Sequence, residues 1–460
     1  MQKIFFAWIF ILIFQYGKAQ NEFITTWKPS NDSAQNILGG VPSTSTQIWF
    51  PGIGNNFSVF WEEVGYPLHN GTLSNITSTA NFLIDFGTPQ NPVASNATYK
   101  VKISNGSGNF STVKFPHTII IFPFDTPPFV SENSGDTKKI IDISQWGNIK
   151  WNTMEYAFYQ CSFLNVSATD LPDLSNVNTT EAMFFLTGLV GNTSFSSWNT
   201  STITNMAYMF GHTPFNQPIG NWDVSNVTDI KWMFHGCNQF NQPLNNWNTS
   251  NIIRMDHAFH FCSAFNQDLS NWKTSKVTNL DFLFGSANIF NQNLGDWDLS
   301  SVINGLQMLS GTNLNCNNWD KTLFGWANNP NSPSNFTLGN VATATYSHPL
   351  AVTARNKLIT IKGWTFSGDI YDPTCESVLS TSETILKTKI SIYPNPATDF
   401  IYLKNLEQSA DYIILDFSGK IVLQGSLKNK EINIKNLSRG NYILQVKAKD
   451  WIENFKFIKK

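Results

Sequence analysis

The sequence has few charged residues. Asp, Glu, Lys and Arg make up 13% of the 460 residues, about half of the share in ordinary globular domains. Asn, Ser and Thr supply most of the polarity instead. No segment carries the stripe of basic residues that binding to DNA or RNA requires. We therefore do not expect nucleic acid as a partner.

The sequence also lacks the short motifs of the common enzyme classes. It contains no glycine-rich phosphate loop, no zinc-hydrolase helix motif and no serine-hydrolase elbow. We therefore expect no enzymatic activity, no cofactor and no bound metal.

Long apolar runs are missing, with one short exception near the first residue. Lys3 is followed by the apolar run 4–14 and then by Gly17-Lys18-Ala19, which is the order of a secretory signal peptide. The run is too short for a membrane-spanning helix, which needs about 20 residues. We expect residues 1–19 to be removed on export, and we expect no transmembrane segment in the mature chain.

The chain does contain a repeat over positions 146–319, with a period of about 25 residues that is typical of stacked repeats. Five tryptophans recur at nearly equal intervals, and two weaker units, starting at Trp146 and Pro172, precede them. Counted from each of these five tryptophans, position +5 is Ile or Val and position +12 is Phe or Leu. The five tryptophans are Trp198, Trp222, Trp247, Trp272 and Trp297. In such an array no unit can bury its own apolar face alone, so stability must come from stacking on neighbours.

Four of the units end in Phe-Asn-Gln, for example Phe240-Asn241-Gln242. Stacking would superimpose these amides, which could then hydrogen-bond from one unit to the next. We interpret them as a structural asparagine ladder in preference to a ligand site, because such side chains commonly satisfy backbone groups in turns.

The repeat resembles that of the BspA-like leucine-rich-repeat surface proteins. The run Trp222-Asp223-Val224-Ser225-Asn226-Val227-Thr228, Met233-Phe234 and the Phe-Asn-Gln segments carry the resemblance. Pro172, Gly305 and Leu309 depart from the pattern, at the two ends of the repeat region. The resemblance implies a secreted or surface-displayed binding or adhesion protein, with no catalytic residues to carry over.

The segment 390–460 has a different sequence pattern, in which short runs of alternating apolar and polar residues, typical of strands, are separated by glycines. It contains Tyr393-Pro394-Asn395-Pro396 near its start, Gly419 and Gly440 in turn-like contexts, and Lys459-Lys460 at its end. This order resembles the type A C-terminal sorting domain of the type IX secretion system, which implies a small β-sandwich and the secretion machinery as a partner. The alternative is an ordinary β-sandwich module.

Charge also sets this tail apart. Residues 389–460 hold 12 Lys and Arg against 7 Asp and Glu, which gives +5 and leaves −7 for residues 1–388 from the total of −2.

These features predict a fold class and six segments. The fold class is a mainly β or irregular solenoid of about seven leucine-rich-like repeats, with a β-sandwich-like N-terminal cap and a C-terminal β-sandwich domain. The segments are a signal peptide at 1–19, a β-rich cap domain at 20–140, the repeats at 141–319, a C-terminal cap at 320–375, a linker at 376–389 and the sorting domain at 390–460. The expected location is the outer cell surface or the medium.

Five cysteines are present, and three of them share position +15 of their units: Cys161, Cys237 and Cys262. Packing as small apolar residues is the favoured interpretation. Because the protein is exported, a bridge between Cys237 and Cys262 is also possible, and Cys316 with Cys375 is a second candidate pair.

Two further groupings were weighed as sites. His235 and His260 share position +13 and could lie side by side, but no third ligand recurs, so we interpret them as surface turn residues. Asp296 and Asp298 flank Trp297, yet other units mostly have Asn there, which argues against paired acid and base work.

The favoured function is binding or adhesion, with an extracellular protein or glycan as the unidentified partner. The alternative is a carbohydrate-binding protein that uses exposed aromatic residues. Position +10 supplies a candidate stripe of four residues: Tyr208, Trp232, His257 and Phe282. If they bind a partner, they should be exposed on one face; the simpler interpretation is that position +10 is partly buried beneath the neighbouring turn.

Overall fold

The computed structural model describes residues 21–32, 41–115, 117–120, 129–133, 135–377, 379, 391–404, 406, 409–416, 420–427, 430–447 and 452–460. The predicted signal peptide lies outside the described residues, and so does almost all of the predicted linker. The chain divides into two compact units, Met1–Val378 and Leu379–Lys460, and each is described by itself.

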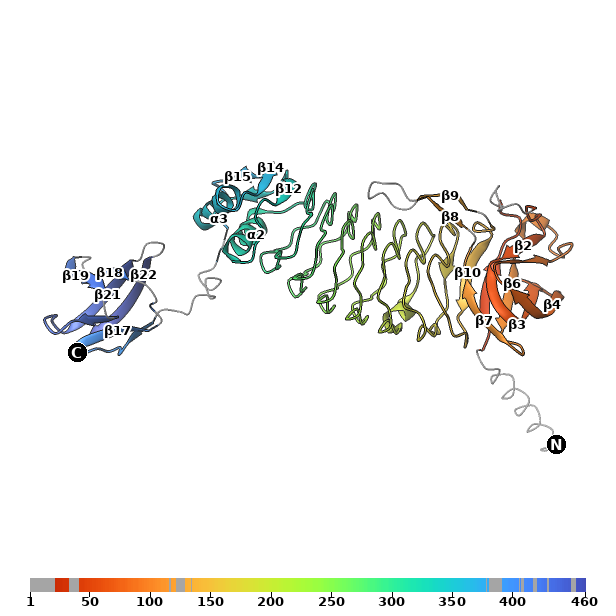
Figure 1. The fold of residues 1–460 in the computed structure, drawn as a ribbon, viewed down its shortest axis with the longest axis horizontal. Coiled ribbons are helices and arrows are strands. Elements are labelled where there is room, and N and C mark those ends of the chain that lie inside the picture. Colours follow the sequence, from red (N-terminus) through yellow and green to blue (C-terminus); the bar gives the residue numbers. More distant parts are fainter. Residues whose placement is uncertain are drawn as a thin grey trace, which may run out of the picture. The chain divides into compact units, whose positions relative to one another are not determined.

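The first unit begins with a seven-stranded sheet (Figure 1). Its strand order is β11-β10-β1-β6-β3-β4, and β7 also pairs with β3. Alternating burial, clearest in the first strand, shows that one face of this sheet packs against a core. The strands are β1 (Phe23–Trp27), β3 (Gly52–Glu63), β4 (Tyr66–Ser78), β6 (Tyr99–Ser104), β7 (Asn109–Val113), β10 (Ile140–Gln145) and β11 (Asn165–Val166).

Two small antiparallel sheets accompany the large one. β2 (Gln47–Phe50) pairs with β5 (Phe82–Asp85), and β8 (His117–Ile120) pairs with β9 (Phe129–Asn133). Phe50 packs against Trp27 of the large sheet with ring centroids 5.5 Å apart. A short 3-10 helix, η1 (Ala94–Asn96), precedes β6.

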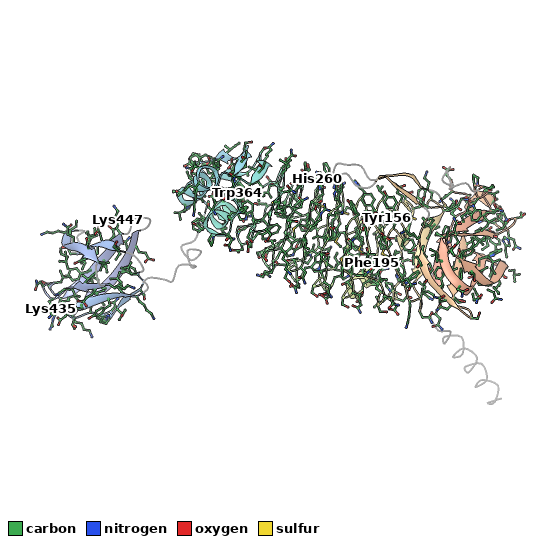
Figure 2. The ribbon with its side chains drawn as sticks, viewed as in Figure 1. Tyr156, Phe195, His260, Trp364, Lys435 and Lys447 are labelled. Carbon is green, nitrogen blue, oxygen red and sulfur yellow. A yellow bond between two sulfur atoms is a disulfide. The ribbon has the colours of Figure 1, made fainter. Side chains whose placement is uncertain are left out.

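The repeats follow as a stack of turn-rich coils, drawn from yellow to green in Figure 1. The tryptophans of neighbouring coils stack with ring centroids 6.1 to 6.3 Å apart. The phenylalanines at position +12 stack at 5.5 to 5.8 Å. All these side chains belong to one buried core, which fills the interior of the coils (Figure 2). Each coil therefore depends on its neighbours for burial.

Backbone hydrogen bonds join each coil to the next at several positions, as at Tyr208, Phe210 and His212, but they form no continuous strand. Isolated parallel β-bridges also link the coils. Lys150 pairs with Asp173, and a second series joins, in order, Thr179, Asn205, Asp229, Arg254, Asn279 and Asn304. The structure describes every residue from 135 to 377, and between β11 and the strand that starts at Thr337 it assigns no strand. The only helices in that stretch are η2 (Thr193–Ser197) and α2 (Cys316–Asn328).

The fold class predicted from the sequence is therefore wrong. The described residues form several small β-sheets with few helices, rather than a solenoid of leucine-rich-like repeats with a β-sandwich-like N-terminal cap and a C-terminal β-sandwich domain. The physical reason lies in the backbone of each coil. Position +10 has a positive φ in every coil, as at Tyr208 (61°) and Trp232 (59°), and a strand cannot continue through that conformation.

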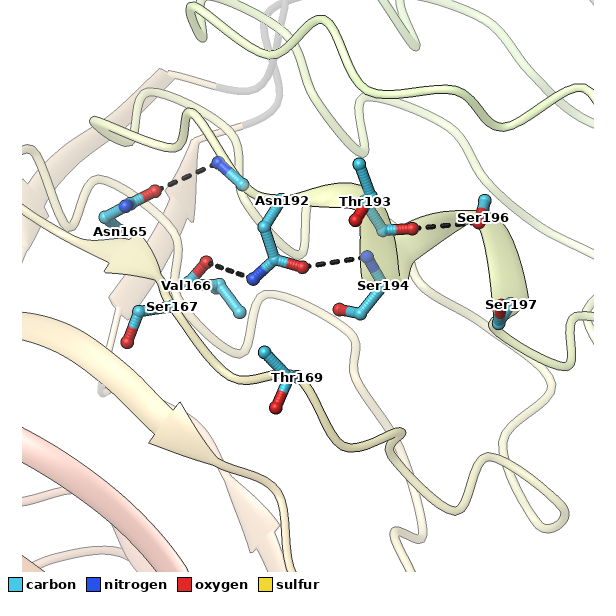
Figure 3. A pocket seen from close by; sticks show the side chains of 10 residues that line it. Asn165, Val166, Ser167, Thr169, Asn192, Thr193, Ser194, Ser196 and Ser197 are labelled. Atoms are coloured by element: carbon cyan, nitrogen blue, oxygen red, sulfur yellow. Dashed lines mark hydrogen bonds between the residues drawn. The ribbon is translucent and has the colours of Figure 1, made fainter.

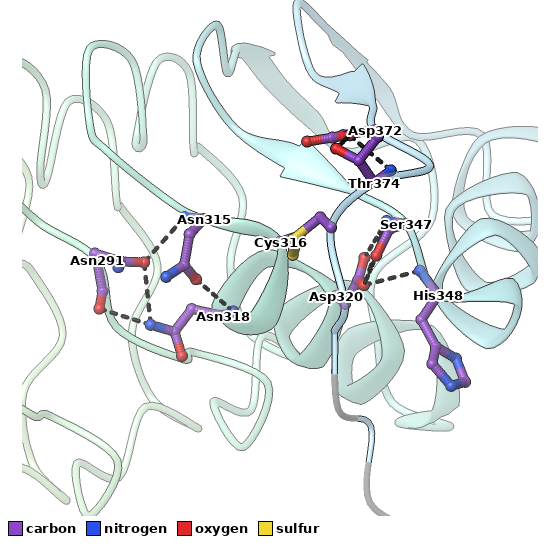
Figure 4. The surroundings of a disulfide bond; sticks show 10 residues. Asn291, Asn315, Cys316, Asn318, Asp320, Ser347, His348, Asp372 and Thr374 are labelled. Atoms are coloured by element: carbon purple, nitrogen blue, oxygen red, sulfur yellow. Dashed lines mark hydrogen bonds between the residues drawn. A yellow bond between two sulfur atoms is a disulfide. The ribbon is translucent and has the colours of Figure 1, made fainter.

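Two helices and two pairs of short strands complete the first unit. α3 (Pro349–Thr360) packs against α2, and both pairs of strands are parallel. Trp319, Trp326 and Trp364 are buried here. Cys316, the first residue of α2, forms a disulfide with Cys375 (Figure 4), which confirms this candidate pair. The strands are β12 (Thr337–Asn340), β13 (Thr345–Tyr346), β14 (Thr365–Ser367) and β15 (Ile370–Tyr371).

The second unit has its own small core and two antiparallel sheets. One sheet has the order β16-β17-β20 and the other has the order β19-β18-β21-β22. The strands are β16 (Ser391–Tyr393), β17 (Phe400–Lys404), β18 (Ala410–Leu415), β19 (Ile421–Leu427), β20 (Glu431–Asn433), β21 (Gly440–Lys447) and β22 (Ile452–Lys459).

Candidate binding surfaces

The four residues of the predicted aromatic stripe do lie in one column, but they are not exposed. Tyr208 and Trp232 are 6% exposed, His257 is 7% exposed and Phe282 is half-buried. Their rings stack on one another, with centroids 6.0, 4.3 and 4.9 Å apart along the column. The expectation of an exposed stripe is therefore wrong, and the simpler interpretation of position +10 agrees with the structure.

The backbone explains this burial. The N–H of Tyr208 donates to the carbonyl oxygen of Lys231 in the next coil at 2.9 Å, and Trp232 donates in the same way to Asp256 at 3.0 Å. These hydrogen bonds hold the left-handed backbone at position +10 close to the next coil. The side-chain ring at position +10 therefore packs against the ring at position +10 of that coil. Lys231 adds a cation–π contact, because its Nζ is 5.3 Å from the centre of the Tyr208 ring.

These rings belong to a second apolar cluster outside the main core, which we call the outer aromatic cluster. It combines position +10 with position +13, where Tyr159 and Phe185 stack at 5.5 Å. Its buried members are Tyr156, Tyr159, Ala182, Phe185, Ala207, Tyr208 and Trp232. Reasoning from the sequence considered position +13 only for His235 and His260, and it missed the aromatic residues Tyr159 and Phe185 at the same position.

Four histidines continue the outer aromatic cluster toward the later coils. His235 contacts His212 at 4.8 Å and His260 at 4.9 Å, measured between ring centroids. His235 and His260 are therefore side by side, as the repeat register predicts, but His235 is buried rather than on the surface. His257 stacks on Trp232. The Nδ1 atoms of His235, His257 and His260 have no hydrogen-bond partner.

The surroundings of these histidines oppose protonation. Burial, followed by the neighbouring His212, His260 and His257, lowers the pKa of His235 to about 2. Burial lowers the pKa of His260 to about 4. Within the part of the chain that the structure describes, no group of three or more His, Cys, Asp or Glu residues could hold a metal ion.

The asparagine ladder is confirmed. Asn241 Oδ1 accepts from the backbone N–H of Asn266 at 3.0 Å and from Gln267 Nε2 at 2.8 Å. The same pattern links Asn216 to Asn241 and Asn266 to Asn291. The ladder ends at the first turn of α2, where Asn318 Nδ2 donates to Asn291 Oδ1 at 3.0 Å (Figure 4).

The other cysteines are buried and free, which agrees with the packing interpretation. Cys237 and Cys262 do not form a bridge. Their thiols donate instead to the carbonyl oxygens of Phe210 and Phe234 in the preceding coils, at 2.9 and 2.8 Å.

A polar groove of about 620 Å³ opens beside β11 and η2, before the first Phe-Asn-Gln segment (Figure 3). Asn165 Oδ1 accepts from the N–H of Gly191, and Asn192 Nδ2 donates to the carbonyl oxygen of Val166. None of the lining side chains is charged. The lining residues are Asn165, Val166, Ser167, Thr169, Gly191, Asn192, Thr193, Ser194, Ser196 and Ser197.

The groove arises from a change in the repeat. In the second coil Val190 and Gly191 take the place of the ladder Asn and Gln, since the N–H of Val190 donates to Asn165 Oδ1 and Gln217 Nε2 donates to the carbonyl oxygen of Val190. The hydroxyl-rich η2 follows directly. Thr169, Thr193 and Ser197 are exposed in the groove. Phe163, two residues before Asn165, is 57% exposed. The arrangement can donate and accept hydrogen bonds without charge.

In the second unit, most of the predicted sorting residues lie near one another. Asn395 Oδ1 accepts from the N–H of Ile458, and Gly440 pairs with Lys459 across β21 and β22. Pro394 and Pro396 flank Asn395 and follow cis peptide bonds. Lys460 is exposed, but Lys459 is only 9% exposed. Gly419 lies outside the described residues.

Comparison with protein families gives two matches. Residues 152–260 and 212–322 match the family described as "Mycoplasma protein of unknown function, DUF285". Residues 391–460 match the family described as "Secretion system C-terminal sorting domain". A comparison with curated proteins found no match. The leucine-rich-repeat resemblance is not among these matches and stays a prediction.

These matches define the class of the protein. It is a repeat protein that type IX secretion exports to the cell surface or the outside. Among the described residues, no helix is long and apolar enough to cross a membrane.

Proposed function

We propose that the protein is an extracellular binding or adhesion protein that presents its stacked coils to a macromolecular partner. Two observations support a role in binding rather than catalysis. The protein is exported, and the groove beside β11 is lined by hydroxyl and amide groups, with no acidic, basic or histidine side chain. Such a lining offers hydrogen bonds, but it has no general acid or general base that could activate its hydroxyl groups for catalysis.

The groove is the observation that carries this proposal. A partner that fits it has uncharged donors and acceptors, because a charged group would lose its hydration without gaining an opposite charge. A segment of protein backbone and a neutral glycan both meet this condition.

A neutral glycan is the second candidate, and the exposed ring of Phe163 favours it. Sugar rings stack on aromatic faces while their hydroxyl groups bond to side chains such as those of Thr193 and Ser197. The buried tryptophans of the coils are not available for this purpose, since Trp247 and Trp272 are 2% and 1% exposed.

The test is binding of the purified exported protein to arrays of neutral glycans and of extracellular-matrix proteins. The groove variants Thr169→Arg and Ser197→Arg place a long charged side chain at exposed lining positions. Ser300→Arg, at an exposed turn of a later coil, is the matched control. We expect both groove variants to weaken binding about tenfold or more, while the control binds as the unaltered protein does.

Phe163→Ala separates the two kinds of partner. Loss of glycan binding in this variant supports the glycan, and retained binding to a matrix protein supports a peptide segment in the groove. Unchanged binding in both arginine variants would show that the groove is not the binding site.

A further inference from the structure

The last strand of the second unit is held on both of its edges. β22 is the terminal strand of its sheet, and it pairs with β21 from Lys447 opposite Ile452 to Gly440 opposite Lys459. An outer edge of this kind normally carries unpaired N–H and C=O groups.

Asn395 and Ala397 cover the final part of that edge. Asn395 Nδ2 donates to the carbonyl oxygen of Lys456 at 2.9 Å, and its Oδ1 accepts from the N–H of Ile458 at 3.0 Å. The N–H of Ala397 donates to the carbonyl oxygen of Ile458 at 2.8 Å, and its own carbonyl accepts from the N–H of Lys460 at 2.9 Å. We call these four hydrogen bonds the terminal clamp.

The side-chain amide of Asn395 takes the place of a backbone peptide in this pairing. Asparagine has one acceptor oxygen and a donor NH₂ group, and the clamp uses both of these atoms. Each of these two atoms makes one hydrogen bond to the end of β22. Ala397 is fully buried, and it forms a parallel bridge with Lys459.

The clamp fixes which side chains of β22 face outward. Over residues 456–460, the end of β22 and the residue after it, Lys456, Ile458 and Lys460 are exposed, while Phe457 and Lys459 are buried. This alternation follows from the period of two in a strand. A slip of one residue would bury the exposed set and display the buried one.

We propose that Lys456, Ile458 and Lys460 form the surface by which the type IX secretion machinery binds the chain, and that Asn395 is a positioning residue that holds them in register. The partner is an acidic surface of that machinery with room for one apolar side chain. Charge supports this choice, because residues 389–460 carry a net charge of +5 and the displayed row places two lysines beside Ile458, which is 47% exposed.

The first test measures export of the full chain in a bacterium with type IX secretion, as the ratio of surface and medium protein to periplasmic protein. In the double variant Lys456→Glu and Lys460→Glu, we expect this ratio to fall about tenfold or more. Lys404→Glu is the matched control, since Lys404 is exposed at the end of β17 in the same unit, and we expect its export to be unchanged. Normal export of the double variant would overturn the proposal.

For Lys459 we expect the opposite result, namely unchanged export. Lys459→Met keeps the buried aliphatic stem and removes a charge that is not displayed, so export should persist. If export fails in Lys459→Met while the melting temperature stays the same, the machinery contacts Lys459 and the proposed surface is wrong.

The role of Asn395 is tested by rescue. Asn395→Ala should reduce export and speed amide hydrogen exchange at residues 456–460, because two of the four clamp bonds are lost. A disulfide between Ala397→Cys and Lys459→Cys, at two paired positions, should restore both readouts in the Asn395→Ala background. The same cysteine pair with Asn395 intact shows the effect of replacing Lys459. If the bridge forms and slows exchange but export stays low, the machinery reads Asn395 directly and the positioning role is overturned.

Discussion

At the scale of single residues, the tryptophans join the coils in two ways. Three neighbouring pairs of indoles stack: Trp198 with Trp222, Trp247 with Trp272, and Trp272 with Trp297. From Trp222 onward, each indole N–H donates to a carbonyl oxygen of the preceding coil. Trp247 Nε1 donates to Ile219 O and Trp272 Nε1 to Leu244 O, both at 3.0 Å. The pattern starts only at Trp222, since the indole nitrogens of Trp146 and Trp198 have no partner. The fixed period of the repeat is thus maintained by both shape and hydrogen bonding.

Trp247 should be costly to remove. We expect Trp247→Ala to lower the free energy of unfolding by about 3 to 5 kcal/mol, because it leaves a large cavity and an unsatisfied carbonyl group. Calorimetric melting of the full protein measures the loss. Ile253→Ala in the same coil is the control, since Ile253 is 42% exposed and its loss should have a small effect. A melting temperature near that of the unaltered protein in Trp247→Ala would show that this ring is not part of the core.

The buried histidines make stability depend on pH. The pKa of His235 is lowered to about 2 and that of His260 to about 4, against about 6.5 in an unfolded chain. The folded state therefore binds fewer protons than the unfolded state below pH of about 6.5, and stability falls as pH decreases through that range. At pH 5 we expect a loss of about 2 kcal/mol for each such histidine relative to neutral pH.

Urea unfolding midpoints at pH 7, 6 and 5 measure this dependence. In His235→Leu part of the decrease should disappear, because the leucine cannot take up a proton on unfolding. His348→Asn, a substitution at the cap of α3 outside the histidine group, serves as the control. The same pH dependence in His235→Leu and in the unaltered protein would contradict the expectation.

At the scale of elements, the sequence predicted interactions that recur in each coil better than it predicted the shape of the coil. The amide pairs and the +12 ring stack depend on residues in one register, as at Asn241 and Phe234, so a fixed period reveals them. The left-handed backbone at position +10 leaves no such pattern, because Tyr208, Trp232 and His257 are not residue types that signal a positive φ. The burial of these side chains was the simpler interpretation of position +10, but the positive φ that accompanies it was not evident from the sequence.

The two helices that end the first unit also escaped prediction. α2 starts within the last repeat and takes over its hydrogen bonds, since Asn318 occupies the place of a ladder glutamine. The repeat pattern in the sequence therefore continues into α2, although the backbone there is helical. The groove beside β11 was missed for a related reason, because it arises from the absence of Phe-Asn-Gln in one coil.

The amide ladder should contribute measurably to stability. Asn266 Oδ1 accepts from the N–H of Asn291 at 2.8 Å and from Gln292 Nε2 at 2.9 Å. Asn266→Ala leaves that backbone N–H unpaired in a half-buried site, so we expect a loss of about 1 to 3 kcal/mol in the free energy of unfolding. Asn238→Ala, at an exposed turn, should change it by less than about 0.5 kcal/mol. Equal urea midpoints for the two variants would show that the ladder does not stabilise the stack.

At the scale of the whole molecule, the two units have separate cores. The core of the first unit runs from Phe23 to Phe366, and that of the second runs from Ala397 to Phe457. The sequence indicates the same division through the change of charge and texture near residue 389. Export and the proposed binding function are thus assigned to different parts of the chain.

Removal of residues 390–460 should therefore separate folding from export. We expect the shortened protein to stay in the periplasm with its coils folded, because the first unit has its own core and disulfide. Cell fractionation locates the protein, and its resistance to protease reports folding. Surface display equal to that of the full chain would show that the segment is not needed for sorting.

The disulfide between Cys316 and Cys375 has a mechanical consequence. The bond joins the first residue of α2 to a residue near the end of the first unit, 59 positions later in sequence. A pulling force that acts on the chain beyond Cys375 passes through this covalent bond directly to Cys316, next to the last coil. α3 and the four short strands between the two cysteines are thereby relieved of load. The stacked coils then carry the tension, and resistance to extension becomes a property of their ring stacks and amide pairs.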